Sequence, residues 1–512
     1  MARGADGGVA MERSLYDHVI HSQDGRLAST SPVTTVEDVR RMVREAQSSP
    51  HGLVLYLHGG LIDRDKGLEG ARALLPRFLD AGAYPVFLVW ESGLLDSILN
   101  STGGPAGVII ARLVAVFDRL GWAGEAAYLF EAPDGRGGLE ARLAVALADD
   151  EELRDAVIRA AEAPARERSS IYPDRGGVAG ASLSREAYRA FFATDPPIGR
   201  FGLDGSAGPS FDPMERLVLF ALGVLDSLLA RERYGRLHGK SQSVVEEILR
   251  RIGLGGRAWE SMKAFADHNF VTAEAASGVR DGAMTVLLNE LAGWERESGA
   301  PARRVTVIAH SAGSIIACNF VDRFREMGLE AQLDVVFLAP AVTHDRFARS
   351  LLGEATSTVI HGFRMFTMDD VHERTDDVWG VYGHSLLYLV SGAFEVRSDL
   401  RLNVRADVPI VGMRRFAHRQ LLTDHAPPRS GWRAQRTPYV TRDEDDAIGI
   451  VEDYLSAPTR LVATPTAGKS APGFESTAQS HSGFAVATLD SLVHIIRHGL
   501  PPVGNEGHGP AR

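Results

Sequence analysis

One pentapeptide has the residue types and the spacing of a serine nucleophile. Residues 309–313 are Ala-His-Ser-Ala-Gly; they follow an apolar segment directly and precede a second apolar segment with helical spacing. A serine on such a tight strand-to-helix turn adopts strained backbone angles, so small residues are needed two positions before and after it, here Ala309 and Gly313. The amino end of the following helix favours developing negative charge. We therefore predict that Ser311 is a nucleophile, with His310 beside it; the alternative is an ordinary turn with a capping serine.

A second segment supplies main-chain groups that could act with this serine. His58, Gly59 and Gly60 follow the apolar segment 53–57 directly. Main-chain N–H groups in such a turn can stabilise the anion of a tetrahedral intermediate. On its own, the segment fits a plain glycine turn equally well.

The other groups needed to activate a serine lie further along the chain. His481 occupies a Gly/Pro/Ser-rich loop after a predicted strand at 460–464. Asp369 and Asp370 follow a predicted strand at 363–368. Successive side chains of an extended segment point to opposite sides, so only one of these two carboxylates can readily reach His481. If the strand ends before Asp369, Asp369 continues its pleat and Asp370 begins the loop.

These residues, in this order, resemble the α/β-hydrolase superfamily, in which the nucleophile, the acid and the histidine follow one another along the chain. The resemblance covers residues 50–95 and 300–500. The pentapeptide, with its His-Ser pair and an alanine in the first small position, is similar to the nucleophile turns of some bacterial lipases. It implies the following site: Ser311, Asp370 (with Asp369 as the alternative acid) and His481 as a catalytic triad, and the main-chain N–H groups of Gly60 or Leu61 and of Ala312 as an oxyanion hole. We prefer Asp370 because the superfamily's acid commonly lies just beyond the strand. No metal and no cofactor are implied.

The elements that would position these residues alternate between strands and helices. Buried strands of a parallel sheet appear as continuous apolar runs. We predict such strands at 53–57, 85–90, 304–308, 334–338, 363–368 and 460–464. Helical patterns lie between several of them, for example at 66–81 and 313–327. This alternation predicts an α/β fold with a mostly parallel central sheet flanked by helices.

A long segment interrupts the alternation and predicts a large, mostly helical cap. The predicted division is a disordered tail at 1–11, a discontinuous α/β-hydrolase core at 12–95 and 301–500, the cap or lid insertion at 96–300, and a second disordered tail at 501–512. We expect the cap to cover the end of the sheet that carries Ser311 and to form an acyl pocket.

Composition limits the classes of protein to which the chain can belong. The 512 residues carry a net charge of −11, which argues against nucleic acid as a partner. The single cysteine, Cys318, excludes a disulfide framework and a multi-cysteine zinc site. We expect its side chain to be buried against the sheet. The sequence shows neither a secretory signal nor a segment long enough to span a membrane, and a cytoplasmic location is predicted.

The sequence therefore predicts a serine hydrolase that cleaves carboxylic esters, including lipid-like ones, through an acyl-enzyme. Amidase, thioesterase and acyltransferase activities on the same residues stay open, because the fold does not fix the substrate. A catalytically idle binding protein is the alternative from another class. The sequence does not indicate an oligomeric state.

Overall fold

The structure is a computed structural model. It describes residues 15–60, 62–90, 105–119, 143–162, 213–233, 237–252, 254–273, 280–353, 359–378, 382–395, 407–417, 442–466 and 471–503. The predicted tail 1–11, and 504–512 of the predicted second tail, lie outside these residues. In the part of the chain described, no helix is both long and apolar enough to cross a membrane.

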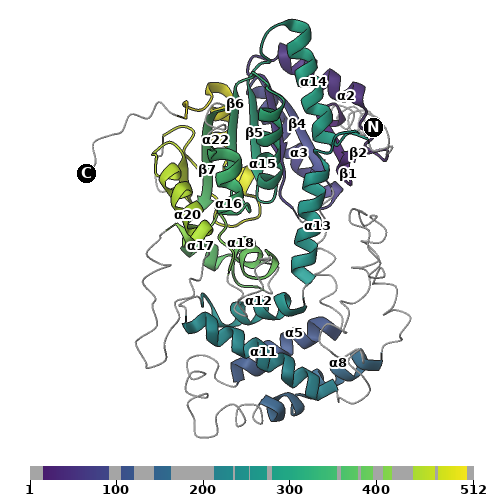
Figure 1. Ribbon diagram of the computed structural model, residues 1–512, viewed down its shortest axis with the longest axis vertical. Helices are drawn as coiled ribbons and strands as arrows, with labels where there is room; N and C mark the ends of the chain where they lie inside the picture. Colours follow the sequence, from purple (N-terminus) through teal and green to yellow (C-terminus); the bar gives the residue numbers. More distant parts are fainter. Residues whose placement is uncertain are drawn as a thin grey trace, which may run out of the picture.

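Eight strands of the described residues form one sheet in the order β2-β1-β4-β3-β5-β6-β7-β8 (Figure 1). Their bounds are β1 Val19–Gln23, β2 Arg26–Leu27, β3 Leu53–Leu57, β4 Tyr84–Trp90, β5 Val305–His310, β6 Leu333–Leu338, β7 Ile360–Met368 and β8 Leu461–Thr464. All neighbouring pairs are parallel except β1 with β2. The prediction of an α/β fold with a mostly parallel sheet is confirmed.

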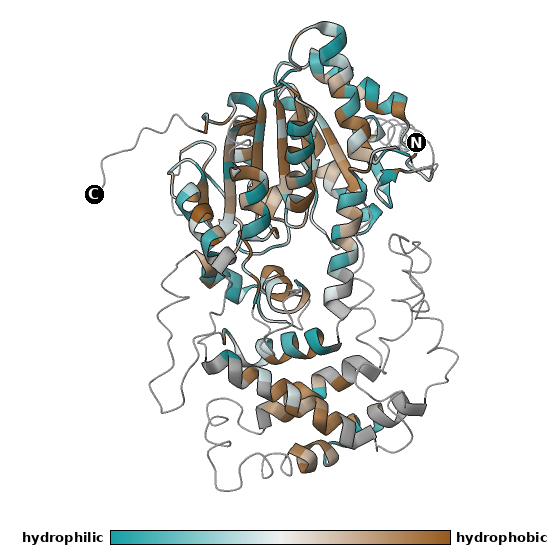
Figure 2. Cartoon of the chain, viewed as in Figure 1, coloured by the Kyte–Doolittle hydropathy of each residue, from teal (hydrophilic) through white to brown (hydrophobic). Residues whose placement is uncertain are grey.

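The six predicted strands correspond to β3 through β8, and their apolar content explains their place. Every residue of β3 and of β6 is buried, as expected for strands covered on both faces. Figure 2 shows the hydrophobic residues, in brown, concentrated along these strands. The short β1 was not among the predicted strands, and it joins the sheet by pairing in parallel with β4.

Helices cover the sheet in the positions that the apolar patterns predict. Their bounds are α2 Val36–Ser48, α3 Arg64–Asp80, α14 Ala283–Ser298, α15 Gly313–Glu326, α16 His344–Phe347, α20 Arg442–Leu455, α21 Phe484–Ala487 and α22 Leu489–His498. Thr35 and Asp38 form a capping box at the start of α2. Helix α14 contacts both α2 and α15, whereas α22 contacts α3.

A second hydrophobic cluster lies apart from the one that surrounds the sheet. It is built mainly by four helices, which we call the helical layer: α5 Pro105–Arg119, α8 Glu151–Glu162, α11 Pro213–Arg233 and α12 Lys240–Ile252. Figure 1 shows this layer in the lower part of the view, at the end of the sheet where β7 leads into α17 (Asp370–Thr375). All four helices fall within the predicted insertion 96–300. Two other helices of that range, α13 (Leu254–His268) and α14, contribute their buried residues to the cluster around the sheet.

Between β7 and β8, the described residues include four short helical segments in addition to α20. They are α17, α18 (Leu386–Leu389), a π-helical turn at Val390–Phe394 and a 3-10 turn at Arg414–Phe416. A further π-helical turn, Ala348–Leu352, follows α16. Helices α17 and α18 lie between the sheet and the helical layer (Figure 1).

Candidate active site

Ser311 occupies the turn between β5 and α15 in a strained conformation. Its φ is 51°, in the left-handed region that residues other than glycine rarely adopt. The loop after β6 holds it there: the Ser311 N–H donates to the Leu338 carbonyl at 2.9 Å, and the Ala341 N–H donates to the Ser311 carbonyl at 3.1 Å. Such strain costs about 1–3 kcal/mol and persists only where the surroundings enforce it, which is typical of functional sites.

Glycines beside the turn allow the two strands β3 and β5 to end in close contact. A Cβ on Gly313 would lie 2.8 Å from the His58 carbonyl oxygen and closer still to that of Leu57. A Cβ on Gly60 would lie 2.9 Å from the Ala312 side chain. Only glycine fits at either position. Gly313, which was predicted to need a small residue, and Gly60 together allow the turn after β3 to pack against the start of α15.

This contact lies at the point where the strand order reverses: β4 is added on one side of β3, and β6 is added on the far side of β5. β3 has β4 on one side and β5 on the other. Helix α3 leads from β3 to β4, whereas α15 leads from β5 to β6 on the opposite side. The loops after β3 and β5 therefore diverge, and open α/β sheets bind ligands in the crevice at such a switch point.

His481 lies against the serine as its order in the sequence predicted. Its Nε2 is 2.9 Å from the Ser311 Oγ, although the two residues are 170 positions apart. Both side chains are buried, with exposures of 7% for His481 and 4% for Ser311. Burial, and secondly the neighbouring His310, lowers the pKa of His481 well below its usual value. The ring is therefore neutral near pH 7, the form that can accept the hydroxyl proton.

His310 and His58 have structural positions beside this pair. The His310 ring lies 5.1 Å from that of His481, and burial lowers its pKa to about 4. His58 donates from Nδ1 to the Gly59 carbonyl at 2.6 Å and accepts at Nε2 from the Trp90 N–H at 3.2 Å. Burial lowers the pKa of His58 to about 4 as well, so its neutral ring fixes the glycine turn rather than reacting.

The structure does not bring either predicted acid to His481. β7 ends at Met368, so Asp369 becomes the N-cap of α17 and accepts from the His372 N–H at 2.8 Å. Asp370, the first residue of that helix, accepts from the Tyr388 hydroxyl at 2.6 Å. Meanwhile the buried Nδ1 of His481 has no hydrogen-bond partner among the described residues. An unpartnered buried nitrogen is unusual enough to require an explanation.

Asp376, which the sequence analysis did not consider, is the carboxylate in contact with His481. Its Oδ2 accepts from the main-chain N–H of His481 at 2.8 Å, and its Oδ1 accepts from the Asp377 N–H at 2.9 Å. Burial raises the pKa of Asp376. Each carboxylate oxygen can accept a second hydrogen bond. No local signal pointed to Asp376, because the six residues of α17 separate it from the end of β7.

Two of the three residues predicted to supply the oxyanion hole, Gly60 and Ala312, are among the described residues. The N–H groups of Gly60 and Ala312 lie on the two sides of the contact described above, and neither donates to an acceptor within the described part of the chain. Leu61 lies outside the described residues. Two main-chain donors at a helix start are an arrangement that can stabilise a developing oxyanion.

Cys318 is fully buried on α15, as predicted, and burial raises the pKa of its thiol to about 12. It takes no part in the site.

Among the described residues, one further cluster has ligand types suited to a metal ion. His238, Glu246 and Asp407 are buried, and their ligand atoms lie within 4.8 Å of one another. However, Arg231 pairs with Glu246 at 2.6 Å, and Arg415 pairs with Asp407 at 3.1 Å. Guanidinium groups already occupy the carboxylates that a cation would need, so this cluster does not fit a metal ion.

Comparison of the chain with protein-family models, with curated proteins and with solved structures gave no match.

Proposed function

We propose that this protein is a serine hydrolase of the α/β-hydrolase type that cleaves carboxylic esters. The observation that carries the proposal is Ser311, held at φ 51° with its Oγ 2.9 Å from Nε2 of a buried histidine. A nucleophile, a base within hydrogen-bond distance and a strained strand-to-helix turn are the features by which such sites are recognised. The mostly parallel sheet and the site at its switch point support the same assignment.

In the proposed mechanism, His481 Nε2 takes the hydroxyl proton as Ser311 Oγ attacks the ester carbonyl carbon. The N–H groups of Ala312 and Gly60 stabilise the resulting oxyanion. His481 then gives the proton to the leaving alcohol, and an acyl-enzyme remains on Ser311. Water, activated by the same imidazole, cleaves this intermediate and regenerates the serine.

We assign the acid of the triad to Asp376. The imidazole can act as a base at Nε2 only if its proton is on Nδ1, and a carboxylate that accepts this proton fixes that tautomer and stabilises the imidazolium. Asp376 is the carboxylate already bonded to the His481 main chain, and it has acceptor capacity left. Asp369 and Asp370 are engaged by His372 and Tyr388.

Both reactive side chains are nearly buried, and Met262 on α13 lies directly against Gly60. We keep as a proposal that part of the predicted insertion covers Ser311 as a lid. We retain the cytoplasm as the predicted location and lipid-like esters within the predicted substrate range.

The test is covalent labelling by a fluorophosphonate probe, which reacts with an activated serine. We expect the wild-type protein to be labelled and Ser311→Ala to be unlabelled. Ser456→Ala, which removes an exposed serine remote from the site, is the matched control and should label as the wild type does. Absence of labelling in the wild type, under conditions where a control esterase reacts, would favour the idle binding protein.

The substrate class is then resolved with nitrophenyl esters from acetate to palmitate, together with matching anilides and thioesters. Faster turnover of esters supports the proposal, whereas faster turnover of anilides or thioesters identifies an amidase or thioesterase on the same residues. Transfer of the acyl group to an added alcohol in place of water identifies an acyltransferase.

A further inference from the structure

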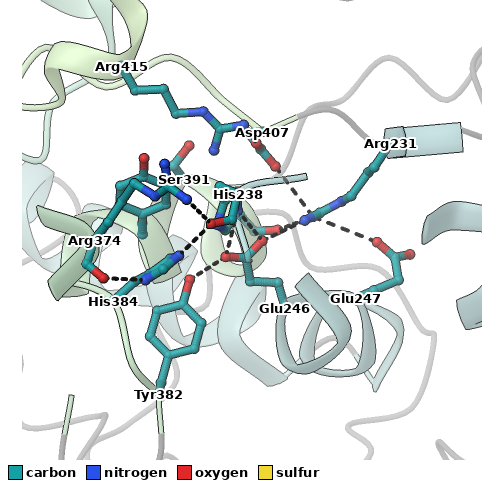
Figure 3. A network of polar contacts seen from close by, with 12 residues as sticks. Arg231, His238, Glu246, Glu247, Arg374, Tyr382, His384, Ser391, Asp407 and Arg415 are labelled. Carbon is teal, nitrogen blue, oxygen red and sulfur yellow. Dashed lines mark hydrogen bonds and ion pairs between the residues drawn. The ribbon is translucent and has the colours of Figure 1, made fainter. Parts of the chain in front are cut away.

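A buried network of charged side chains joins the helical layer to the segments beside the candidate site (Figure 3). Arg231 on α11 donates to Glu246 on α12 at 2.6 Å, and it lies 3.4 Å from Asp407. All three side chains are at most 1% exposed. Charged groups buried to this extent are stable only when they are paired, and removing one partner leaves an uncompensated charge.

Every carboxylate of this network has a guanidinium partner. The carboxylates are Glu246, Glu247 and Asp407, and the guanidinium groups are Arg231, Arg250, Arg415 and the partly exposed Arg251. Because the cations of the chain itself complete the cluster, it forms a fixed connection between segments. The segments that it connects are α11 and α12 on one side and residues 407–415 on the other.

Two histidines extend the network to α17. The His384 ring nitrogens face two main-chain carbonyl oxygens: Nδ1 lies 2.9 Å from that of Arg374, and Nε2 lies 3.0 Å from that of His238. The Arg374 side chain also donates to the His238 carbonyl at 2.9 Å. His238 itself lies 3.2 Å from Glu246. The last turn of α17 is thereby tied to the start of α12.

Tyr388 on α18 makes the corresponding contact at the first turn of α17. Its ring lies 4.7 Å from the ring of His238, and its hydroxyl donates to Asp370 at 2.6 Å. Ser385 adds a third tie, because its hydroxyl donates to the buried Glu373. Both turns of α17 are therefore held from the side on which the helical layer lies.

These ties matter because α17 is too short to be stable by itself. It has six residues, and an isolated helix of this length does not form in water. Asp376 follows it directly and accepts from the His481 N–H. The position of the proposed acid therefore depends on α17, and that of α17 depends on the ties just described.

We propose that the helical layer positions the catalytic histidine through this network, with Tyr388 and Arg374 as positioning residues that act through α17 and Asp376. This inference rests on the proposed function. It assigns the predicted insertion a part in assembling the triad, in addition to any part in covering the substrate.

The test compares a tyrosine of this network with a tyrosine outside it. Tyr388→Phe removes the hydroxyl that binds Asp370 on α17, whereas Tyr84→Phe removes a hydroxyl on β4 that binds the Asp17 carbonyl. Both variants keep the aromatic ring. We expect Tyr388→Phe to lower kcat about tenfold with KM unchanged, because the imidazole is misplaced in the transition state, and Tyr84→Phe to keep the wild-type kcat.

A double variant separates positioning from general destabilisation. If Tyr388 acts through Asp376, Tyr388→Phe should change kcat less than about twofold in an Asp376→Asn background. Hydrogen–deuterium exchange of residues 369–378 should be faster in Tyr388→Phe and unchanged in Tyr84→Phe. The proposal is overturned if the two tyrosine variants match in kcat and in exchange, or if the tenfold loss persists undiminished without Asp376.

The two proposals fail in different ways. A labelled, active wild type with equivalent tyrosine variants refutes the positioning network and leaves the hydrolase standing. A wild type that is neither labelled nor active refutes the hydrolase, and the exchange comparison alone then decides whether the network orders α17.

Discussion

The contact between Gly313 and the end of β3 offers the sharpest test of the proposed oxyanion hole. A Cβ at this position would lie 2.8 Å from the His58 carbonyl oxygen, and ordinary van der Waals contact begins at 3.4 Å. The atom it meets belongs to the main chain and cannot rotate away. The Leu57 carbonyl oxygen lies closer still and sets the limit, so Gly313→Ala must move the start of α15 away from β3 by about 1 Å.

This displacement acts on catalysis more than on folding. Overpacking by one methyl group costs about 1–3 kcal/mol of unfolding free energy. The same movement separates the N–H groups of Gly60 and Ala312, and a misplacement approaching 1 Å can cost about 10²-fold in rate. We expect kcat on a nitrophenyl ester to fall about 10- to 100-fold, while circular dichroism shows a folded protein.

The matched control is Gly70→Ala on α3. A Cβ there would meet nothing within 4 Å, and alanine in a helix is favoured over glycine by about 0.5–1 kcal/mol. Gly70→Ala should keep full activity and gain slightly in stability by urea denaturation. If folded Gly313→Ala hydrolyses the ester as fast as Gly70→Ala does, the close approach of the two turns is not needed for the reaction and our oxyanion assignment is wrong.

Two further predictions concern titratable groups. Asp376→Asn should lower kcat by on the order of 10⁴, which is the loss seen when the carboxylate of a catalytic triad is replaced. Asp369→Asn should stay active, and equal losses of kcat at both positions would refute the choice of Asp376 as the acid. Burial lowers the pKa of His58, His310 and His344 from 6.5 to about 4 each. Between these pH values the unfolded chain binds more protons than the folded protein does. The free energy of unfolding must therefore fall as the pH drops from 6.5 to 4, by up to about 3 kcal/mol per histidine. Urea denaturation at pH 7 and at pH 4.5 measures this, and equal stabilities would contradict the buried, neutral state of these rings.

The elements that the sequence predicted best are those whose signal is local. The apolar run Leu53–Leu57 can only be a strand buried on both faces, and it is β3. The sequence placed the proposed nucleophile at the end of β5 because the requirement for small neighbours acts within five residues. His481 was predicted from the chain order of the superfamily that the sequence resembles, and the structure places it against Ser311.

The proposed acid, Asp376, was harder to predict because its position depends on tertiary contacts. Asp369 and Asp370 have the correct residue type next to the strand, but a helix begins there and turns both side chains to other partners. Asp376 lies next to His481 because α17, which separates it from β7, returns the chain toward the loop that carries His481. The sequence gives no local indication of that path, since α17 is stabilised by Tyr388 and Ser385 from α18 and the residue before it.

The charged network was beyond sequence analysis for a similar reason. Arg231, Glu246 and Asp407 come from three separate segments, and 161 positions separate Arg231 from the Gly392 carbonyl to which it also donates. Taken singly, each of these charged residues is of a type that is usual on a solvent-exposed helix face or loop. Only their common burial shows that they form one unit.

Two unfavourable features of the core coincide at Ser311 and His481. The serine carries the cost of a left-handed backbone, and the histidine keeps a buried Nδ1 with no partner among the described residues. Each feature also occurs alone elsewhere in the described part of the chain, a left-handed backbone at Asp24 and Ala339 and an unpartnered ring nitrogen at His344, but at Ser311 and His481 the two lie on one hydrogen-bonded pair. In an enzyme the same features are useful: the strain presents Oγ to the substrate, and Nδ1 is held ready for a carboxylate that tightens upon it as the imidazolium forms. The coincidence of the two costs on one hydrogen-bonded pair therefore favours the hydrolase over the idle binding protein.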